Sequence, residues 1–385
     1  MLNGFRIYDA DAHVMMTPEM WRDLPKEYHL RRPRPISIGD SADLAHWRTA
    51  WLLDGRIEPH PYGPGTHAAN NPGMTMVEYG AKADNAGDFN AEGLSIGCVT
   101  LADPVARLKE MDKLGAEVQM LFPSTLYATM TADPGYEAAL FRCYNRYMAA
   151  QCKHSPRRLK WAGLLPMRDV KLALEALDEL LKLGAGTVMV FGTVGERMQS
   201  DPAFRPIWDA IAASKIPVCV HMAMSFPPFD QLCHSIQDAN MIGKAMPAQI
   251  GFVALVGHRM MERYTDMKVA FLEFGGEWIF YSVGRMSHYM EINKRRMADP
   301  SMLPKQTPEE IVKSGRFFLA VESSDKMMPH ELALLGDGQL LYSSDFPHGE
   351  GRDSAAMEII ERTDITKEQK QKILWDNAVK FFGEP

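Results

Sequence analysis

Short apolar runs alternate with longer amphipathic stretches along most of this chain. The runs have the length of buried strands, and the stretches show the three-to-four-residue spacing of apolar positions that is typical of helices. The predicted strands are Phe5–Asp9, Val118–Phe122, Lys160–Leu165, Thr187–Phe191, Pro217–His221, Lys268–Glu273, Phe317–Val321 and Leu340–Ser343. The predicted helices are Pro104–Leu114, Pro134–Lys153, Val170–Leu183, Ala203–Ser214, Phe252–Arg263, Trp278–Arg296 and a last one near Thr366–Phe382. Repeated strand–helix units of this kind predict an α/β fold with a parallel sheet.

The number of units distinguishes between two folds with parallel sheets. A dinucleotide-binding fold would carry a G-x-G-x-x-G turn after its first strand. Here the first strand leads into Asp9-Ala-Asp-Ala-His13 instead. Eight units in 385 residues fit a (β/α)8 TIM barrel, which we expect to form one domain over residues 1–385.

Two segments interrupt the repeated pattern. Residues 23–98, approximately, are rich in proline, glycine and asparagine without a sustained period, and we interpret them as a long insertion after the first strand. Its apolar residues, such as Trp47 and Trp51, need a surface to bury against, so the insertion is expected to be a lid over the barrel mouth or a subunit contact. Residues 224–250 predict a shorter insertion after strand five.

Composition narrows the class of protein. Hydrophobic residues make up 46% and charged residues 24%, as in ordinary globular proteins. A net charge of −7 argues against a cationic surface for nucleic acid. No run of about 18 apolar residues predicts a membrane span, and no apolar signal stretch follows the first residues, so a cytoplasmic enzyme is expected. Five widely spaced cysteines suggest neither a disulfide framework nor a zinc knuckle.

Polar side chains follow several of the predicted strands. Asp11 and His13 come directly after strand one and share one side of an extended chain, while His221 ends strand five. Glu273 ends strand six, and Asp345 follows strand eight. The carboxyl ends of barrel strands form the active site of TIM-barrel enzymes, so these side chains should converge at one mouth. Mixed nitrogen and oxygen ligands suit Zn²⁺, Mn²⁺ or Fe²⁺, and the residue types alone do not choose among these ions.

Each of these residues also has a simpler interpretation. A carboxylate at a strand end often caps the next helix, a lone histidine often lies satisfied in a core, and Glu273 could pair with a basic side chain. His348 is expected to orient Asp345, with a plain surface role as the alternative. Glu322 and His288 are weaker candidates, and His258 is interpreted as structural. The methionines of the expected pocket segments either line an apolar cavity or fill gaps in the core; they are Met15, Met16, Met222 and Met224.

Four motifs together resemble the amidohydrolase-related family. They are Asp9-Ala-Asp-Ala-His13-Val, Pro217-Val-Cys-Val-His221, Leu272-Glu273-Phe-Gly-Gly-Glu-Trp278 and Ser343-Ser-Asp345-Phe-Pro-His348. Members of that family include aminocarboxymuconate-semialdehyde decarboxylase and the resorcylate and carboxyvanillate decarboxylases. The resemblance spans nearly the whole chain outside residues 23–98, and it says more about the superfamily than about the substrate.

The resemblance implies a metal site made by Asp11, His13, His221 and Asp345. Asp11 departs from the family's histidine or glutamate but keeps an anionic oxygen. Glu273 stands where the decarboxylases carry a catalytic histidine, so Glu273 is expected to move protons or to help hold a second ion. Asp345 and His348 complete the expected catalytic set.

The missing histidine favours hydrolysis of a small aromatic or acyl substrate by a metal-activated water. Non-oxidative decarboxylation of an aromatic or unsaturated acid is the alternative, and an inactive barrel that serves as a binding subunit is a third hypothesis. One or possibly two divalent ions, a small-molecule substrate, no nucleic acid or membrane partner and a homo-oligomer complete the expectations.

Overall fold

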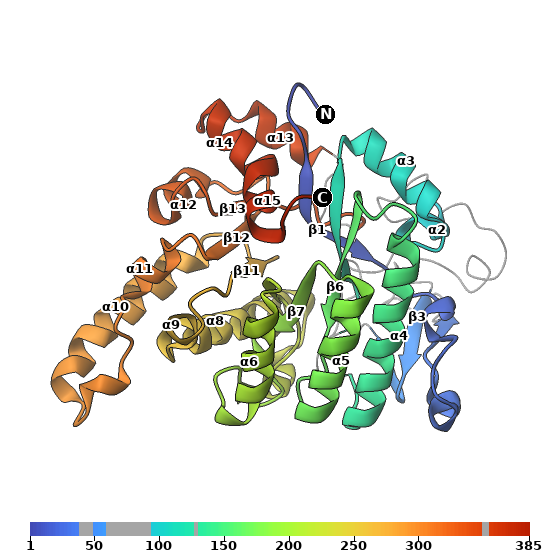
Figure 1. Ribbon diagram of the computed structural model, residues 1–385, viewed down its shortest axis with the longest axis horizontal. Helices are drawn as coiled ribbons and strands as arrows, with labels where there is room; N and C mark the ends of the chain where they lie inside the picture. Colours follow the sequence, from blue (N-terminus) through green and yellow to red (C-terminus); the bar gives the residue numbers. More distant parts are fainter. Residues whose placement is uncertain (38–48, 59–93, 127–129, 349–353) are drawn as a thin grey trace.

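Eight parallel strands form the central sheet of this protein (Figure 1). The structure is a computed structural model that describes residues 1–37, 49–58, 94–126, 130–348 and 354–385. The strands lie in the sheet in chain order: β1 (Tyr8–Val14), β5 (Val118–Pro123), β6 (Leu159–Leu164), β7 (Thr187–Phe191), β10 (Val218–His221), β11 (Val269–Leu272), β12 (Phe317–Val321) and β13 (Leu340–Tyr342). All eight predicted strands are confirmed. The first is displaced, because β1 continues through Asp11 and His13 instead of ending at Asp9.

The first and last strands meet, so the sheet is a barrel. The backbone N–H of Asp345 donates to Asp11 O at 3.0 Å, and the N–H of His13 donates to Phe346 O at 2.6 Å. The sequential strand order and the parallel pairing of neighbours are those of the predicted TIM barrel. The barrel closes just beyond β13, at Asp345, which pairs with Asp11 and which the sequence analysis names as a candidate site residue.

Helices surround the barrel, and α4, α5 and α6 form one visible side of it in Figure 1. The α-helices that precede β10 in the chain are α2 (Ile96–Val99), α3 (Pro104–Leu114), α4 (Pro134–Cys152), α5 (Val170–Leu183) and α6 (Arg205–Ser214). Those that follow β10 are α7 (Ile236–Asp238), α8 (Met246–Phe252), α9 (Met260–Arg263), α10 (Trp278–Arg296), α11 (Pro308–Val312), α12 (Met328–Leu335), α13 (Ala355–Glu361), α14 (Lys367–Gln371) and α15 (Asn377–Phe382).

Local capping chemistry explains why the predicted boundaries of α3 and α5 agree with the structure. Asp103 accepts the backbone N–H groups of Val105 and Ala106 at the start of α3, and Asp169 accepts that of Leu172 in α5. Both helices end on a glycine in the left-handed region, Gly115 with φ +74° and Gly184 with φ +84°.

The first insertion contains regular structure that its sequence does not signal. An antiparallel sheet joins β2 (Arg34–Ser37), β3 (Thr49–Leu53) and β4 (Arg56–Glu58). Trp51 is buried in the main core, as predicted, whereas Trp47 lies outside the described residues. Arg31 anchors this part of the chain, since it donates to both carboxylate oxygens of Asp54 and to Asp133 at the start of α4.

The second insertion is mostly helical, and the predicted helix start at Phe252 is wrong. After the 3₁₀ turn Pro227–Leu232, one helical run begins at Ile236 and includes two π-helical segments, Ala239–Ala245 and Val253–Gly257. This run contacts the end of β7 closely, because a Cβ on Gly192 would lie 1.7 Å from the Pro247 carbonyl oxygen. Backbone packing of this kind produces no periodic pattern of apolar residues, so the sequence does not predict it.

Part of that helical run, Ala239–Gly257, is long and apolar enough to cross a membrane by length and composition alone. This differs from the sequence-based expectation. More than half of the segment is buried inside the fold, and the core helix of a globular protein passes the same test.

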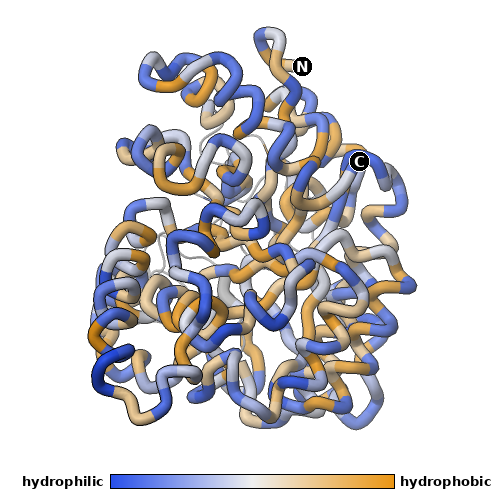
Figure 2. Tube along the Cα trace, turned by 60° about the vertical axis from the view of Figure 1, so that its left-hand side comes forward, coloured by the Kyte–Doolittle hydropathy of each residue, from blue (hydrophilic) through white to orange (hydrophobic). Residues whose placement is uncertain are grey.

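The core fills the barrel and the layer between strands and helices. Every strand residue of β1, β5, β7, β10, β11, β12 and β13 is buried. Figure 2 shows the hydrophobic segments running through the interior, with hydrophilic residues gathered on the outer turns. The five cysteines are buried and free.

Candidate metal centre

Strand β1 presents its polar residues to the barrel mouth through an irregularity. Asp9 pairs with Gln119 of β5, but the next pair is Ala12 with Leu121, so β1 holds one extra residue at this point. Such a β-bulge bends a strand and redirects a side chain, and bulges are frequent beside active sites. Asp11, which lies within the bulge, is fully buried, and His13 is 1% exposed.

The remaining site residues follow other strands. His221 is the last residue of β10, Glu273 comes directly after β11, and Asp345 lies three residues after β13 ends. Glu273 has φ +64° and Asp345 has φ +55°, a conformation that carries a steric penalty for residues other than glycine. Strain of this kind concentrates at functional sites, where the surrounding structure holds a side chain in place.

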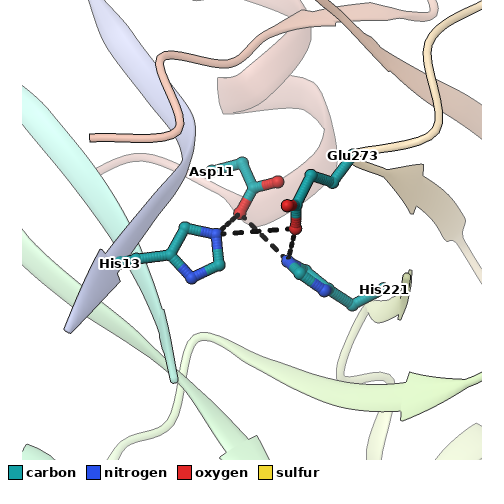
Figure 3. A group of neighbouring side chains, drawn as sticks. All are labelled: Asp11, His13, His221 and Glu273. Atoms are coloured by element: carbon teal, nitrogen blue, oxygen red, sulfur yellow. Dashed lines mark ion pairs between the residues drawn. The ribbon is translucent and has the colours of Figure 1, made fainter. Parts of the chain in front are cut away.

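Four of these side chains point toward one another in Figure 3. Nε2 of His13 lies 3.4 Å from Asp11 Oδ1 and 3.8 Å from Glu273 Oε2. Nε2 of His221 lies 3.6 Å from the same Asp11 oxygen and 3.0 Å from Glu273 Oε2. One ligand atom from each of the four residues therefore lies within 4.8 Å of the others.

Asp345 and His348 extend the cluster on the side of His13. Asp345 Oδ1 lies 3.1 Å from His13 Nε2 and 2.8 Å from His348 Nδ1. The His348 ring stacks on the His13 ring at 4.0 Å, and its Nε2 lies 2.9 Å from Ser124 Oγ. The predicted contact between His348 and Asp345 is thus present in the structure, and Ser124 is a partner that the sequence did not suggest.

The electrostatics of the cluster favour bound positive charge. Burial opposes the imidazolium form of His13, but the close carboxylates of Asp11 and Asp345 outweigh burial and raise the pKa of His13 to about 10. Burial opposes ionisation of Asp345, yet nearby His348 and His13 hold the pKa of that carboxyl well below its usual range. Asp11 and Asp345 therefore stay ionised and attract cations, whether protons on the histidines or a metal ion.

The donor set also fits a divalent ion. The side chains of Asp11 and His221 are more than nine-tenths buried. Although Asp11 Oδ1 and His221 Nε2 lie close to other atoms of the cluster, neither they nor Asp11 Oδ2 make a hydrogen bond of regular geometry with the described residues. Neither ring nitrogen of His13 makes a hydrogen bond of regular geometry with the described residues. Buried polar atoms without partners are rare in folded proteins, and a metal ion at their common centre would satisfy them.

A cavity of about 220 Å³ opens beside Glu273 and Asp345. Its wall combines serine hydroxyls with apolar side chains, including Ser324, Ser343, Met222 and Phe274. Glu322, a weaker candidate of the sequence analysis, also lines it. Met15, Met16 and Met224 are buried, in line with the core-filling interpretation, and only Met222 of that group is part of the cavity wall.

Two histidines lie away from the mouth. His258 is exposed and contacts Ser200, which agrees with a structural role, while His288 is exposed on α10 beside Tyr289. Neither belongs to the cluster.

Comparison with known proteins assigns this architecture to a family. Residues 99–383 match the amidohydrolase family model. A curated relative, 2-amino-3-carboxymuconate-6-semialdehyde decarboxylase of Dictyostelium discoideum, is 21% identical over 73% of this chain and 77% of its own.

Two solved structures are similar over nearly the whole chain. An amidohydrolase from Mycobacterium avium subsp. paratuberculosis has a TM-score of 0.74 at 20% identity and covers 100% of this chain and 99% of its own. A mutant 5-carboxyvanillate decarboxylase from Novosphingobium aromaticivorans, solved with manganese and 3-methoxy-4-hydroxy-5-nitrobenzoic acid, has a TM-score of 0.71 at 16% identity, covering 98% and 97%. The family match covers most of the sequence and includes His221, Glu273 and Asp345, so this chain belongs to the amidohydrolase family.

Proposed function

We propose that this protein is a metal-dependent, non-oxidative decarboxylase of an aromatic or unsaturated carboxylic acid. The observation that carries the proposal is the cluster of Asp11, His13, His221, Glu273 and Asp345 at the barrel mouth, of which Glu273 and Asp345 also line the adjoining cavity. The cavity volume suits a small molecule about the size of one substituted ring. The named relatives with a stated activity are decarboxylases, which supports this reaction over the hydrolysis that the sequence alone favours.

Asp11, His13, His221 and Asp345 are proposed to hold the ion. A bound divalent ion would act as a Lewis acid and stabilise negative charge on a substrate oxygen. The ion's identity stays open among zinc, iron and manganese, although the structurally similar 5-carboxyvanillate decarboxylase was solved with manganese.

Glu273 is proposed to move the proton. The bond between the ring or vinyl carbon and the carboxylate carbon breaks, CO₂ leaves, and the electron pair left on carbon takes a proton from the Glu273 carboxyl. Glu273 lines the cavity as well as the cluster, so it can reach a substrate there. His348 orients Asp345 through the 2.8 Å contact and need not touch substrate.

Hydrolysis is the second candidate, because Glu273 replaces the histidine that the resemblance leads one to expect. A direct comparison separates the two reactions. Protein reconstituted with Mn²⁺, Zn²⁺ or Fe²⁺ is given hydroxybenzoates on one side and matched aryl amides and esters on the other. Release of CO₂ from an acid, absent in metal-free protein, supports decarboxylation. Cleavage of an amide or ester without CO₂ release from any acid overturns the proposal.

A further inference from the structure

Asp9 is buried beside the cluster without belonging to it. Its side chain is 1% exposed, and the bulge between Asp9 and Ala12 interrupts the alternation of side chains along β1 between Asp9 and His13. Its carboxylate accepts hydrogen bonds from Ser344 N at 3.0 Å, Ser344 Oγ at 2.5 Å and Gln119 Nε2 at 3.0 Å. No oxygen of Asp9 belongs to the ligand groups of the described residues.

These bonds reach both carboxylate ligands through their neighbours in the chain. Ser344 precedes Asp345, so two hydrogen bonds to Asp9 fix the backbone immediately before that strained residue. On β1, the N–H of Asp11, which lies in the bulge, is directed at Asp9 Oδ1 at 3.4 Å. The Asp9 carboxylate therefore joins the first and last strands at the point where Asp11 and Asp345 enter the cluster.

A buried arginine holds the other end of this network. Arg107, on α3, is fully buried, and its Nε donates to Gln119 Oε1 at 2.8 Å. Its Nη1 donates to the backbone oxygen of His13 at 3.0 Å, and its guanidinium lies 4.5 Å from the centre of the Phe346 ring. Arg107 thus contacts the residues on both sides of the strand junction.

Neither charge has a direct ion-pair partner among the described residues, since Gln119 stands between Asp9 and Arg107. Burying a carboxylate and a guanidinium is unfavourable unless hydrogen bonds compensate. A network needed only for packing could use apolar side chains of similar volume at lower desolvation cost. Here, apart from the contacts with Gln119, the hydrogen bonds of Asp9 and Arg107 join them to Ser344, Asp11 and His13, each of which is or adjoins a proposed ligand.

We propose that Asp9, held by Gln119 and Arg107, is a positioning residue that sets the separation of Asp11, His13 and Asp345 for metal binding. The inference rests on the metal centre proposed above and adds to it a network that does not touch the ion. Outer-sphere partners of metal ligands typically contribute 10–100-fold to metal affinity.

The test uses Co²⁺ as the probe, because Co²⁺ reports both affinity and coordination through its visible absorption. Asp9→Asn keeps the shape of the side chain but places an NH₂ group where Gln119 and Ser344 donate, so Co²⁺ should bind about 10–100-fold more weakly with an altered spectrum. The double variant Asp9→Asn/Gln119→Glu restores complementarity, since the amide introduced at position 9 then donates to an acid at position 119 that also accepts from Arg107. It should recover most of the affinity and the spectrum.

Two further variants keep the test decisive. Ile211→Val removes a buried methylene on α6, away from the mouth, and should lower stability by about 0.5–1.5 kcal/mol without changing Co²⁺ affinity. Gln119→Met leaves the Asp9–Ser344 bonds intact and serves if Asp9→Asn does not fold; it should also weaken binding.

Unchanged affinity and spectrum in both Asp9→Asn and Gln119→Met overturn the inference. Weak binding in Asp9→Asn that the double variant does not rescue shows that hydrogen-bond complementarity between positions 9 and 119 does not set the affinity, and it overturns the positioning role. Wild-type protein that binds no divalent ion overturns the metal centre, and the inference with it.

Discussion

We predict that the stability of this protein depends on pH through Glu331, which lies against the turn that follows Glu273. This residue of α12 is fully buried, and no hydrogen-bond donor reaches either carboxylate oxygen among the described residues. A Cβ on Gly276 would lie 1.8 Å from Glu331 Oε1, so the carboxyl is packed against the turn that follows Glu273. Burial, then the nearby carboxylates of Asp325 and Glu277, raise the pKa of Glu331 to about 9, with Arg362 opposing them.

The direction of the effect follows from proton linkage. Between the unfolded-state pKa of about 4.5 and the native pKa of about 9, the native state keeps a proton on Glu331 that the unfolded state has lost. The contribution of Glu331 to stability is therefore fully present below pH 4.5 and is lost progressively as pH rises to 9. One proton corresponds to at most about 1.4 kcal/mol per pH unit, or about 2–3 kcal/mol between pH 6 and pH 8.

Glu331→Gln should remove this dependence, because an amide keeps the shape, does not titrate and can donate to Asp325. Free energies of unfolding are measured in urea at pH 6, 7 and 8 for the wild type, for Glu331→Gln and for Glu309→Gln, an exposed control on α11. The variant should gain on the wild type as pH rises, and the control should follow the wild type. A difference between Glu331→Gln and wild type that stays constant across this range would refute the reasoning.

Two other predictions concern the reaction and the packing. Glu273→Gln should keep its metal content, measured by metal analysis, and lower turnover, measured by CO₂ release, by roughly 10²–10⁴-fold. If the variant's metal content instead falls from about two ions per chain to about one, Glu273 is a ligand of a second ion. Gly192→Ala should destabilise the protein severely, because its Cβ would lie 1.7 Å from the Pro247 carbonyl oxygen. Gly284→Ala, in open space on α10, should instead stabilise the protein by roughly 0.5–1 kcal/mol. Thermal unfolding of both variants checks the prediction, and equal effects would show that the contact at Gly192 is not rigid.

The barrel could be predicted from sequence because its signals are local. Apolar runs mark the strands, and Asp103, Asp169, Gly115 and Gly184 mark helix ends by chemistry within three residues. The convergence of the candidate ligands could be predicted for a related reason, since the C-terminal ends of barrel strands converge wherever the strands are correctly identified.

Features that depend on distant partners were not predictable in the same way. In the sequence, Asp9 is indistinguishable from an ordinary polar strand residue, because its hydrogen-bond donor Ser344 lies 335 positions away. Glu331 reads as an ordinary helix glutamate, and its burial depends on the turn at Gly276. The π-helical segments of the second insertion flank Pro247, whose close contact with Gly192 no periodicity encodes. The choice between hydrolysis and decarboxylation rests on the relatives and on substrate tests.

Metal stoichiometry in purified protein tests the central claim most directly. Wild-type protein, His221→Ala and Asp345→Asn are reconstituted with Mn²⁺, freed of excess ion and analysed for metal per chain, with Lys294→Ala on the outer helix α10 as a control. Both ligand variants remove one donor from a buried set, so we expect about one tightly bound ion in the wild type and the control and little in either variant. Unchanged stoichiometry in His221→Ala or Asp345→Asn would contradict the assignment of the barrel mouth as the metal centre.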